Sequence, residues 1–189
     1  IAKKTNRSHW HFVKSVLLQD QGKVAEAMKE QQLCIASAEK EVSADASAIN
    51  YYELAQCCMV FKDYAKAESA INQSLKQEAD NPTYEITLAK ILAAQKRFSE
   101  AQKIASTVPV SVCNCNIIDK AEVLQACGNY KQSLALLNKS LKEGDETAQE
   151  HYLRSLAYKH LGSPDKAAAD LKRANQLGYD KDPLLRLPI

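Results

Sequence analysis

Residues 51–67 read YYELAQCCMVFKDYAKA, and the spacing of their apolar side chains predicts two short helices joined by a turn. Ala55 and Cys58 lie three places apart on one face of a first helix, and Tyr64 and Ala67 repeat that spacing in a second. The small side chain of Ala55 allows the second helix to approach closely. One such helix pair buries too little apolar surface to be stable alone, so neighbouring pairs must stack on it.

The same pattern recurs along the whole chain. The small residue of the first helix returns at intervals of 40, 34, 32 and 34 residues, at Ser15, Ala55, Ala89, Ala121 and Ser155. Seven places after each of them comes the turn residue, which is Gly22, Lys62, Lys96, Gly128 or Gly162. Few glycines and prolines interrupt the chain, and Ala, Leu, Lys, Gln and Glu are abundant. The sequence therefore predicts an all-α chain built of five helix pairs.

A period near 34 residues with this order of side chains resembles the tetratricopeptide repeat, a helix-turn-helix unit. The resemblance implies an α-solenoid, a right-handed superhelix of about five repeats, and it covers nearly the whole chain. We place the repeats at residues 8–47, 48–81, 82–113, 114–147 and 148–180, after an N-terminal flank (1–7) and before an apolar tail (181–189) that caps the last pair or docks on a partner.

Several local signals refine these boundaries. The first repeat is predicted to have helices at 8–20 and 23–42, because its extra residues lengthen an uninterrupted second helix. Asn81 before Pro82 and the pair Thr147 and Glu150 are helix-start signals. Residues 110–115 are predicted to be a non-helical connection. Lys14, Lys120 and Arg154 replace an apolar residue of the family pattern, which predicts less regular packing in repeats one, four and five.

Composition excludes some classes of function. Lys plus Arg number 25 and Asp plus Glu number 23, a net charge of +2, which is too balanced to indicate a nucleic acid or an anionic membrane as partner. No apolar stretch is long enough to span a bilayer. No signal peptide is visible after Ile1, although an upstream segment removed by processing would leave an extracytoplasmic location open.

The family resemblance implies a non-enzymatic scaffold that binds a peptide segment or an amphipathic helix of another protein in a concave groove lined by the first helix of each repeat. Mapping the inward-facing positions gives candidate groove residues: Phe12, Ile49, Tyr52, Gln56, Met59, Ile86, Lys90, Ile118, Glu122, Tyr152 and Lys159. Lys90 as the cation beside an apolar patch predicts a ligand with an acidic residue next to its apolar anchor. For Phe12, Ile49, Ile86 and Ile118, packing between neighbouring first helices is the alternative.

Two other functions stay open at this stage. The chain is an assembly element that self-associates through an exposed end or through the long helix of the first repeat, or it is the regulatory domain of a larger effector protein. The sequence offers no catalytic motif, such as a phosphate-binding glycine loop or His-Glu-x-x-His, and indicates no cofactor.

Six cysteines raise the question of metal or disulfide bonding: Cys34, Cys57, Cys58, Cys113, Cys115 and Cys127. Their spacings do not match a structural zinc site. Cys34 and Cys58 fall at core positions of stacked helices and approach each other, but such positions seldom offer disulfide geometry. The sequence therefore predicts free thiols, which favour a cytoplasmic setting.

Overall fold

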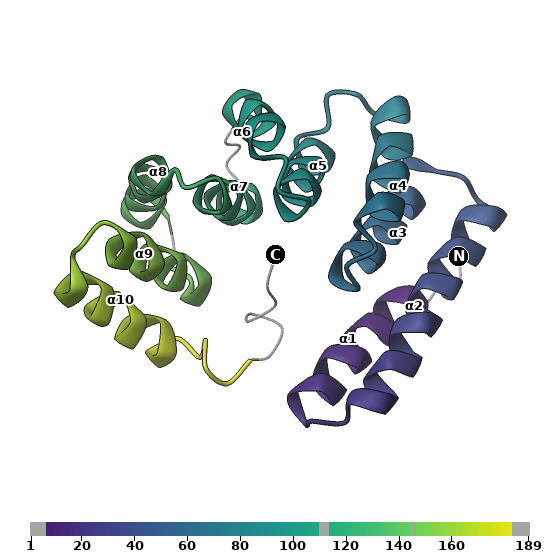
Figure 1. Ribbon diagram of the computed structural model, residues 1–189, viewed down its shortest axis with the longest axis horizontal. Coiled ribbons are helices and arrows are strands. Elements are labelled where there is room, and N and C mark those ends of the chain that lie inside the picture. The colour runs from purple at the N-terminus through teal and green to yellow at the C-terminus, as the bar shows by residue number, and fades with distance from the viewer. Residues whose placement is uncertain (1–6, 110–113, 145, 183–189) are drawn as a thin grey trace. The chain divides into compact units, whose positions relative to one another are not determined.

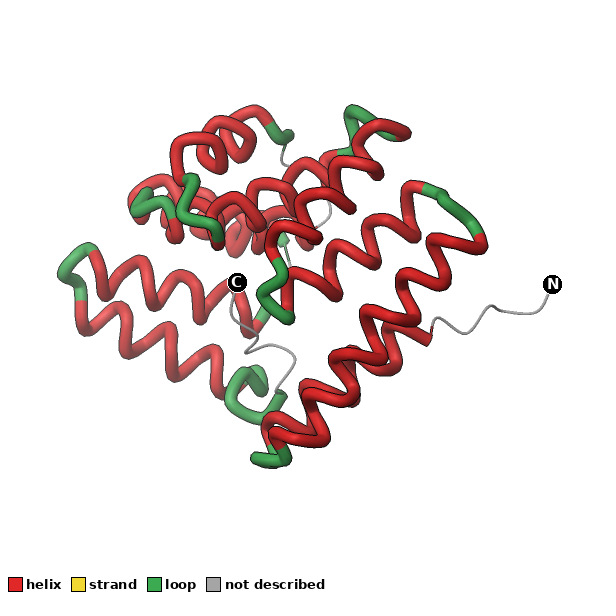
Figure 2. Tube along the Cα trace, turned by 45° about the vertical axis from the view of Figure 1, so that its right-hand side comes forward, coloured by secondary structure: helices red, strands yellow, loops and turns green. Residues whose placement is uncertain are grey.

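The computed structural model describes residues 7–109, 114–144 and 146–182, and it folds them into helices joined by short turns (Figure 1). In the part that it describes there is no strand (Figure 2). The helices are α1 (Arg7–Asp20), α2 (Val24–Ala44), α3 (Ala48–Val60), α4 (Tyr64–Gln77), α5 (Pro82–Ala94), α6 (Phe98–Thr107), α7 (Asn114–Ala126), α8 (Tyr130–Glu143), α9 (Ala148–His160) and α10 (Pro164–Gln176). The predicted all-α fold is confirmed.

The helices fall into two compact blocks, and each is described by itself. The N-terminal block ends at Tyr84 and the C-terminal block begins at Glu85, inside α5. In the N-terminal block α1 packs on α2 and α3 on α4, and α3 also contacts both helices of the preceding pair. In the C-terminal block α5 and α6 share one apolar cluster, α7 packs on α8 and α9 on α10. The second helix of each pair there contacts the first helix of the next.

Small buried residues hold each pair together. The predicted small positions of the first helices are all nearly inaccessible, at Ser15, Ala55, Ala89, Ala121 and Ser155. Ala89 packs against Ala101 and Ala105 of α6 in the cluster that also holds Ile86 and Leu92. Because protein interiors are close-packed, a larger side chain at such a position would force the helices apart. The five small residues predicted to lie at helix contacts are thus all buried.

The turn between the two helices has the same hydrogen bonds in every repeat. In the fourth repeat the N–H of Gly128 donates to the carbonyl of Gln125 (2.9 Å) and the N–H of Asn129 donates to that of Leu124 (2.7 Å). This pair of bonds defines a Schellman motif, which requires a left-handed residue at the turn. Gly128 has φ +78°, and Lys96 takes the same conformation with φ +64°.

The helix ends mostly follow their sequence signals. The side chain of Asn81 accepts a hydrogen bond from the N–H of Thr83 (3.0 Å), and Thr147 and Glu150 form the predicted capping box. The predicted end of the first repeat's second helix is two residues short, since α2 reaches Ala44. Asn114 and Cys115 lie in α7, so the prediction of a non-helical 110–115 is wrong for them. Residues 1–6 of the predicted flank (1–7), residues 110–113, residue 145 and residues 183–189 of the predicted tail (181–189) lie outside the described residues.

Candidate binding surface

In the N-terminal block, four candidate groove residues share one face of α3. Ile49, Tyr52, Gln56 and Met59 stand at i, i+3, i+7 and i+10, the spacing that brings side chains to one helix face, and we call them the α3 groove face. Ile49 is 50% exposed, Gln56 is exposed, and Tyr52 and Met59 are half-buried. Phe12 is half-buried on α1, which contacts α3. These residues therefore offer an accessible surface with aromatic, apolar and amide groups.

Tyr52 is held in place by two neighbours. The amide of Gln56 donates a hydrogen bond to the Tyr52 hydroxyl (2.7 Å), and the Tyr52 ring lies 5.2 Å from the ring of Tyr84 at a tilt of 36°. Such tilted aromatic pairs are favourable beyond the area that they bury. Burial and the nearby carboxylates of Glu78 and Glu53 raise the pKa of Tyr84. The arrangement fixes the ring of Tyr52 before any ligand is present.

In the C-terminal block, Lys90 and Glu122 are partners of each other. The Lys90 ammonium lies 2.7 Å from Asp119 and 2.9 Å from Glu122. Burial by itself opposes the charge of Lys90, but the two carboxylates outweigh it and raise the pKa of its ammonium above the ordinary value. Burial also raises the pKa of Glu122 despite the neighbouring cation. The prediction that Lys90 offers a free positive charge to an acidic ligand residue is wrong, because its charge is compensated within the fold.

The other candidates in this block differ in accessibility. Ile86 has no exposed surface and belongs to the core cluster of α5 and α6, so its side chain is not accessible to a ligand in the groove. Ile118 is half-buried against the cluster of Ala121, Leu137 and Leu153. The ring of Tyr152 stacks on that of Tyr179 at 4.1 Å, and Lys159 is exposed.

The first and last repeats each contain a polar triad that the sequence analysis did not identify. Its members stand at i, i+3 and i+19: His11, Lys14 and Glu30 in one, and His151, Arg154 and Asp170 in the other. Nδ1 of His11 lies 2.7 Å from Glu30, and Lys14 donates to the other oxygen (2.5 Å). Nδ1 of His151 lies 3.0 Å from Asp170, and Arg154 donates two hydrogen bonds of 2.7 Å to it. The recurrence of the i, i+3 and i+19 spacing in both repeats is the sequence signal from which the triads could have been identified.

These triads give two of the three unexpected cations a partner. The third, Lys120, donates to the carbonyl of Val108 (2.7 Å). Each cation that replaces an apolar residue is thus satisfied within its block, and the predicted irregular packing does not follow from them.

The cysteines depart from the sequence prediction. Cys34 of α2 and Cys57 of α3 form a disulfide with their Cα atoms 6.3 Å apart. The prediction of free thiols is wrong for Cys34 and Cys57, and Cys57 rather than Cys58 is the residue bonded to Cys34. Cys58 is a free, buried thiol whose pKa burial raises to about 12. The disulfide removes the argument from free thiols for a cytoplasmic setting.

Other kinds of site find no support in the described ranges. Those residues contain no group of three or more His, Cys, Asp and Glu side chains arranged to hold a metal ion. None of the helices within them has the length and apolarity needed to cross a membrane.

Comparison with known proteins agrees with this architecture. Residues 61–111 match the family model described as tetratricopeptide repeat. No curated protein matches the chain. A tetratricopeptide repeat protein from Parabacteroides merdae is 15% identical over 98% of this chain and 83% of its own, with a TM-score of 0.71.

Two further solved structures resemble the chain. TTC0263, a thermophilic TPR protein in Thermus thermophilus, is 14% identical over 92% of this chain and 94% of its own, with a TM-score of 0.65. YrrB, described as a TPR protein with an unusual peptide-binding site, is 18% identical over 91% and 87%, with a TM-score of 0.56. At these identities the likeness concerns the fold. Residues 61–111 thus match a tetratricopeptide repeat model, and the chain shares the all-α fold of solved tetratricopeptide repeat structures.

Proposed function

We propose that the chain is a non-enzymatic scaffold that binds an extended segment or an amphipathic helix of another protein on the α3 groove face. The observation that carries this proposal is the half-exposed Ile49 beside the fixed ring of Tyr52. Interfaces depend on a few anchoring apolar and aromatic residues, and a ring already held by Gln56 and Tyr84 loses little freedom on binding. The fold supports the proposal, as does the peptide-binding site described for the structurally similar YrrB.

The candidate groove residues of the C-terminal block are expected to contribute less to ligand binding than the α3 groove face does. There Lys90 and Glu122 neutralise each other, Ile86 is buried, and Tyr152 is stacked on Tyr179. These side chains have partners within the fold, so binding energy has to come mainly from the α3 groove face. The ligand is therefore expected to present an apolar anchor without a requirement for an acidic neighbour.

A peptide-display library panned on the immobilised chain tests this proposal. Selected peptides are titrated by calorimetry against the wild type, Tyr52→Ala and Ile49→Asp, and each substitution is expected to weaken binding by roughly 1–3 kcal/mol. Leu33→Asp is the matched control, because Leu33 is 47% exposed on α2 and lies outside the α3 groove face. Equal affinities for all four proteins would remove this face from the mechanism.

A further inference from the structure

In α3, α7 and α9, the first helix of the repeat has a second contact face, which packs on the preceding repeat. Its three positions stand at i, i+3 and i+7, and the last of them is buried at Cys57, Ile91, Val123 and Ala157. Cys57 is bonded to Cys34 of α2. Val123 lies in one cluster with Ala105 of α6 and with Val108, the residue directly after α6. Leu153, at the middle position of α9, packs against Leu137 of α8. We call this surface the stacking face.

In α1 the stacking face has no preceding helix among the described residues. It consists of Trp10, Val13 and Leu17. Trp10 is 64% exposed and Leu17 is 42% exposed, whereas the residues equivalent to Leu17 in the other four first helices are at most 5% exposed. A single exposed leucine has no special meaning. Here, however, Leu17 occupies a position that is buried in each of the other first helices, and Trp10 occupies one that is buried in α5, α7 and α9.

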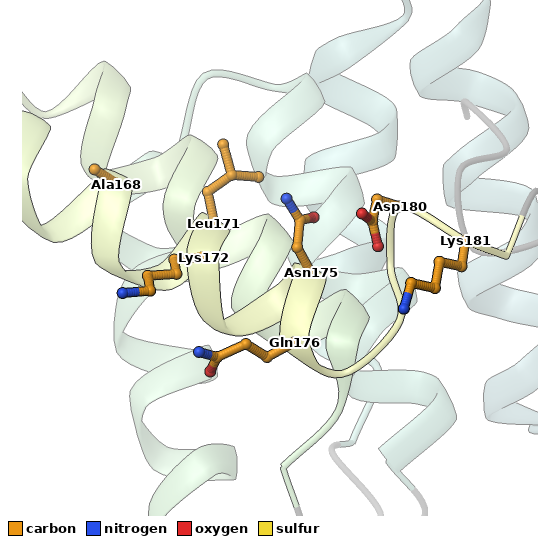
Figure 3. Close-up of a pocket in the computed structure, with 7 residues that line it drawn as sticks. All are labelled: Ala168, Leu171, Lys172, Asn175, Gln176, Asp180 and Lys181. Carbon is orange, nitrogen blue, oxygen red and sulfur yellow. The ribbon is translucent and has the colours of Figure 1, made fainter.

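The second helices show the complementary situation at the other end of the chain. Ala105 and Leu137 are fully buried in clusters that include a residue of the next first helix. Leu171 holds the same position in α10 and is 42% exposed. It lies in an open hollow of about 560 Å³ that we call the α10 hollow. Figure 3 shows its lining along α10 and the following turn: Ala168, Leu171, Lys172, Asn175, Gln176, Asp180 and Lys181.

We propose that these two surfaces bind each other in different copies of this chain, with the stacking face of α1 in one copy seated in the α10 hollow of the next. The occupant is a second copy of this chain. The exposed side of α10 carries the same repeat positions through which α8 packs on α9. Trp10 supplies a projecting apolar side chain, and the hollow supplies space beside Leu171. The two faces differ, so the contact is head-to-tail, and each copy can bind one further copy through each face.

Trp10 is the only tryptophan of the chain, so its fluorescence reports on this contact directly. With rising protein concentration, the emission is expected to shift to shorter wavelength as the indole leaves water. Over the same range, sedimentation equilibrium is expected to show a weight-average mass that rises above 20.9 kDa and passes the value for a dimer.

Two single substitutions distinguish a head-to-tail contact from other modes. Leu17→Lys changes only the stacking face, and the new ammonium group would face the lysines that border the hollow of the next copy. Leu171→Lys changes only the hollow. Each variant alone is expected to remain monomeric, with an affinity for itself lowered roughly tenfold or more. A mixture of the two retains one intact face of each kind, so it should form a 1:1 complex of twice 20.9 kDa and stop there. Leu33→Lys, equally exposed on α2, is the control that should associate like the wild type.

Helical circular dichroism checks that each variant is folded. A concentration-independent monomer with unshifted emission overturns the proposal. Loss of association in Leu17→Lys but not in Leu171→Lys does so too, because it indicates a symmetric contact between two α1 helices. Association that appears only after residues 183–189 are removed assigns the hollow to the chain's own tail and likewise contradicts the proposal.

Discussion

Lys62 and Lys96 occupy the left-handed turn position that is glycine in the other three repeats. Their φ angles of +63° and +64° are close to those of the equivalent glycines. A residue with a Cβ carries a steric cost in this region, whereas glycine does not. The five turns therefore share one geometry, but two of them contain an unfavourable residue.

This comparison predicts opposite effects of two substitutions in the C-terminal block. Gly128→Ala should destabilise the block by roughly 1 kcal/mol. No atom lies within 4 Å of the added Cβ, so backbone strain is the only cost. Lys96→Gly should stabilise it by less, because glycine also raises the entropy of the unfolded chain. Urea unfolding of both variants measures the difference, and an unchanged midpoint for Gly128→Ala would contradict the left-handed turn.

The polar triad of the last repeat links stability to pH. Burial alone would raise the pKa of Asp170, but hydrogen bonds and charge from Arg154 and His151 lower it below its ordinary value. The other ring nitrogen of His151 lies 2.8 Å from Glu146. Because carboxylates only accept hydrogen bonds, both ring nitrogens can donate only when the imidazole is protonated. Hydrogen bonds from Arg173 and His151 lower the pKa of the exposed Glu146 to about 2.

Asp170→Asn should therefore flatten the acid side of the stability profile. A carboxylate whose pKa is lower in the folded state contributes stability above its unfolded pKa, and this contribution is lost as the pH falls through the folded value. At neutral pH the substitution should cost roughly 1–3 kcal/mol, the range for hydrogen bonds to charged groups. Urea unfolding between about pH 2 and pH 6 tests this.

Glu146→Gln is the control for that experiment. Glu146 is exposed and its ion pairs are screened by solvent, so its removal should change stability far less than Asp170→Asn does. Equal losses from the two substitutions would show that burial of Asp170 does not strengthen its contacts.

Some residue-level features could be predicted from the sequence and others could not. The buried small residues such as Ala89 follow from spacing alone, because only one side-chain size fits where two helices touch. The partners of His151 and Arg154 depend on a residue of the following helix, nineteen and sixteen places away. The side-chain directions of two packed helices decide such contacts, and a single helix pattern does not contain them.

At the scale of helices, the Cys34–Cys57 disulfide connects the first two repeats. It joins α2 to α3 across 23 residues of sequence, where the long α2 meets the next first helix. Closing a loop of this size restricts the unfolded chain. The bond therefore reinforces the contact between two repeats in addition to the packing within each of them.

Reduction of this bond should destabilise the N-terminal block by roughly 2–4 kcal/mol. Alkylation in denaturant without reductant should leave Cys34 and Cys57 unmodified, and proteolysis should yield a linked peptide pair. Cys57→Ala should make the stability of this block insensitive to reductant, whereas Cys127→Ala in the other block should not. Full alkylation of Cys34 in unreduced protein would restore the prediction of free thiols.

Helix positions were more predictable than the contacts between helices. The starts of α5 and α9 follow from the capping residues Asn81 and Thr147, because such signals act within a few neighbouring residues. The fourth repeat was placed from residue 114, where α7 begins, but the predicted non-helical connection extended two residues too far because residues 110–115 lack such signals. The choice of Cys57 over Cys58 was missed because it depends on how α3 is rotated about its own axis relative to α2. Neighbouring residues of a helix point about 100° apart, so this rotation decides which cysteine faces α2.

At the scale of the whole chain, each block carries one surface of the proposed assembly, and the N-terminal block also carries the proposed ligand-binding face. The α3 groove face belongs to the N-terminal block, while the α10 hollow belongs to the C-terminal block. In repeat proteins, stability is approximately a sum of terms from single repeats and from contacts between neighbours. A change inside one block should therefore leave the internal contacts of the other unaltered.

Leu137→Ala tests this independence. Leu137 is fully buried with Ala121 and Leu153, so the substitution should cost roughly 2–5 kcal/mol. Hydrogen exchange should accelerate in α7, α8 and α9 and stay unchanged in α1, α2 and α3. Reduction of the Cys34–Cys57 disulfide should give the reverse pattern, and the two perturbations together should add within about 0.5 kcal/mol if the two blocks are independent. A larger deviation, or faster exchange in α1 after Leu137→Ala, would show that the chain unfolds as one cooperative body, and then ligand binding at the α3 groove face and assembly through the α10 hollow would be energetically coupled.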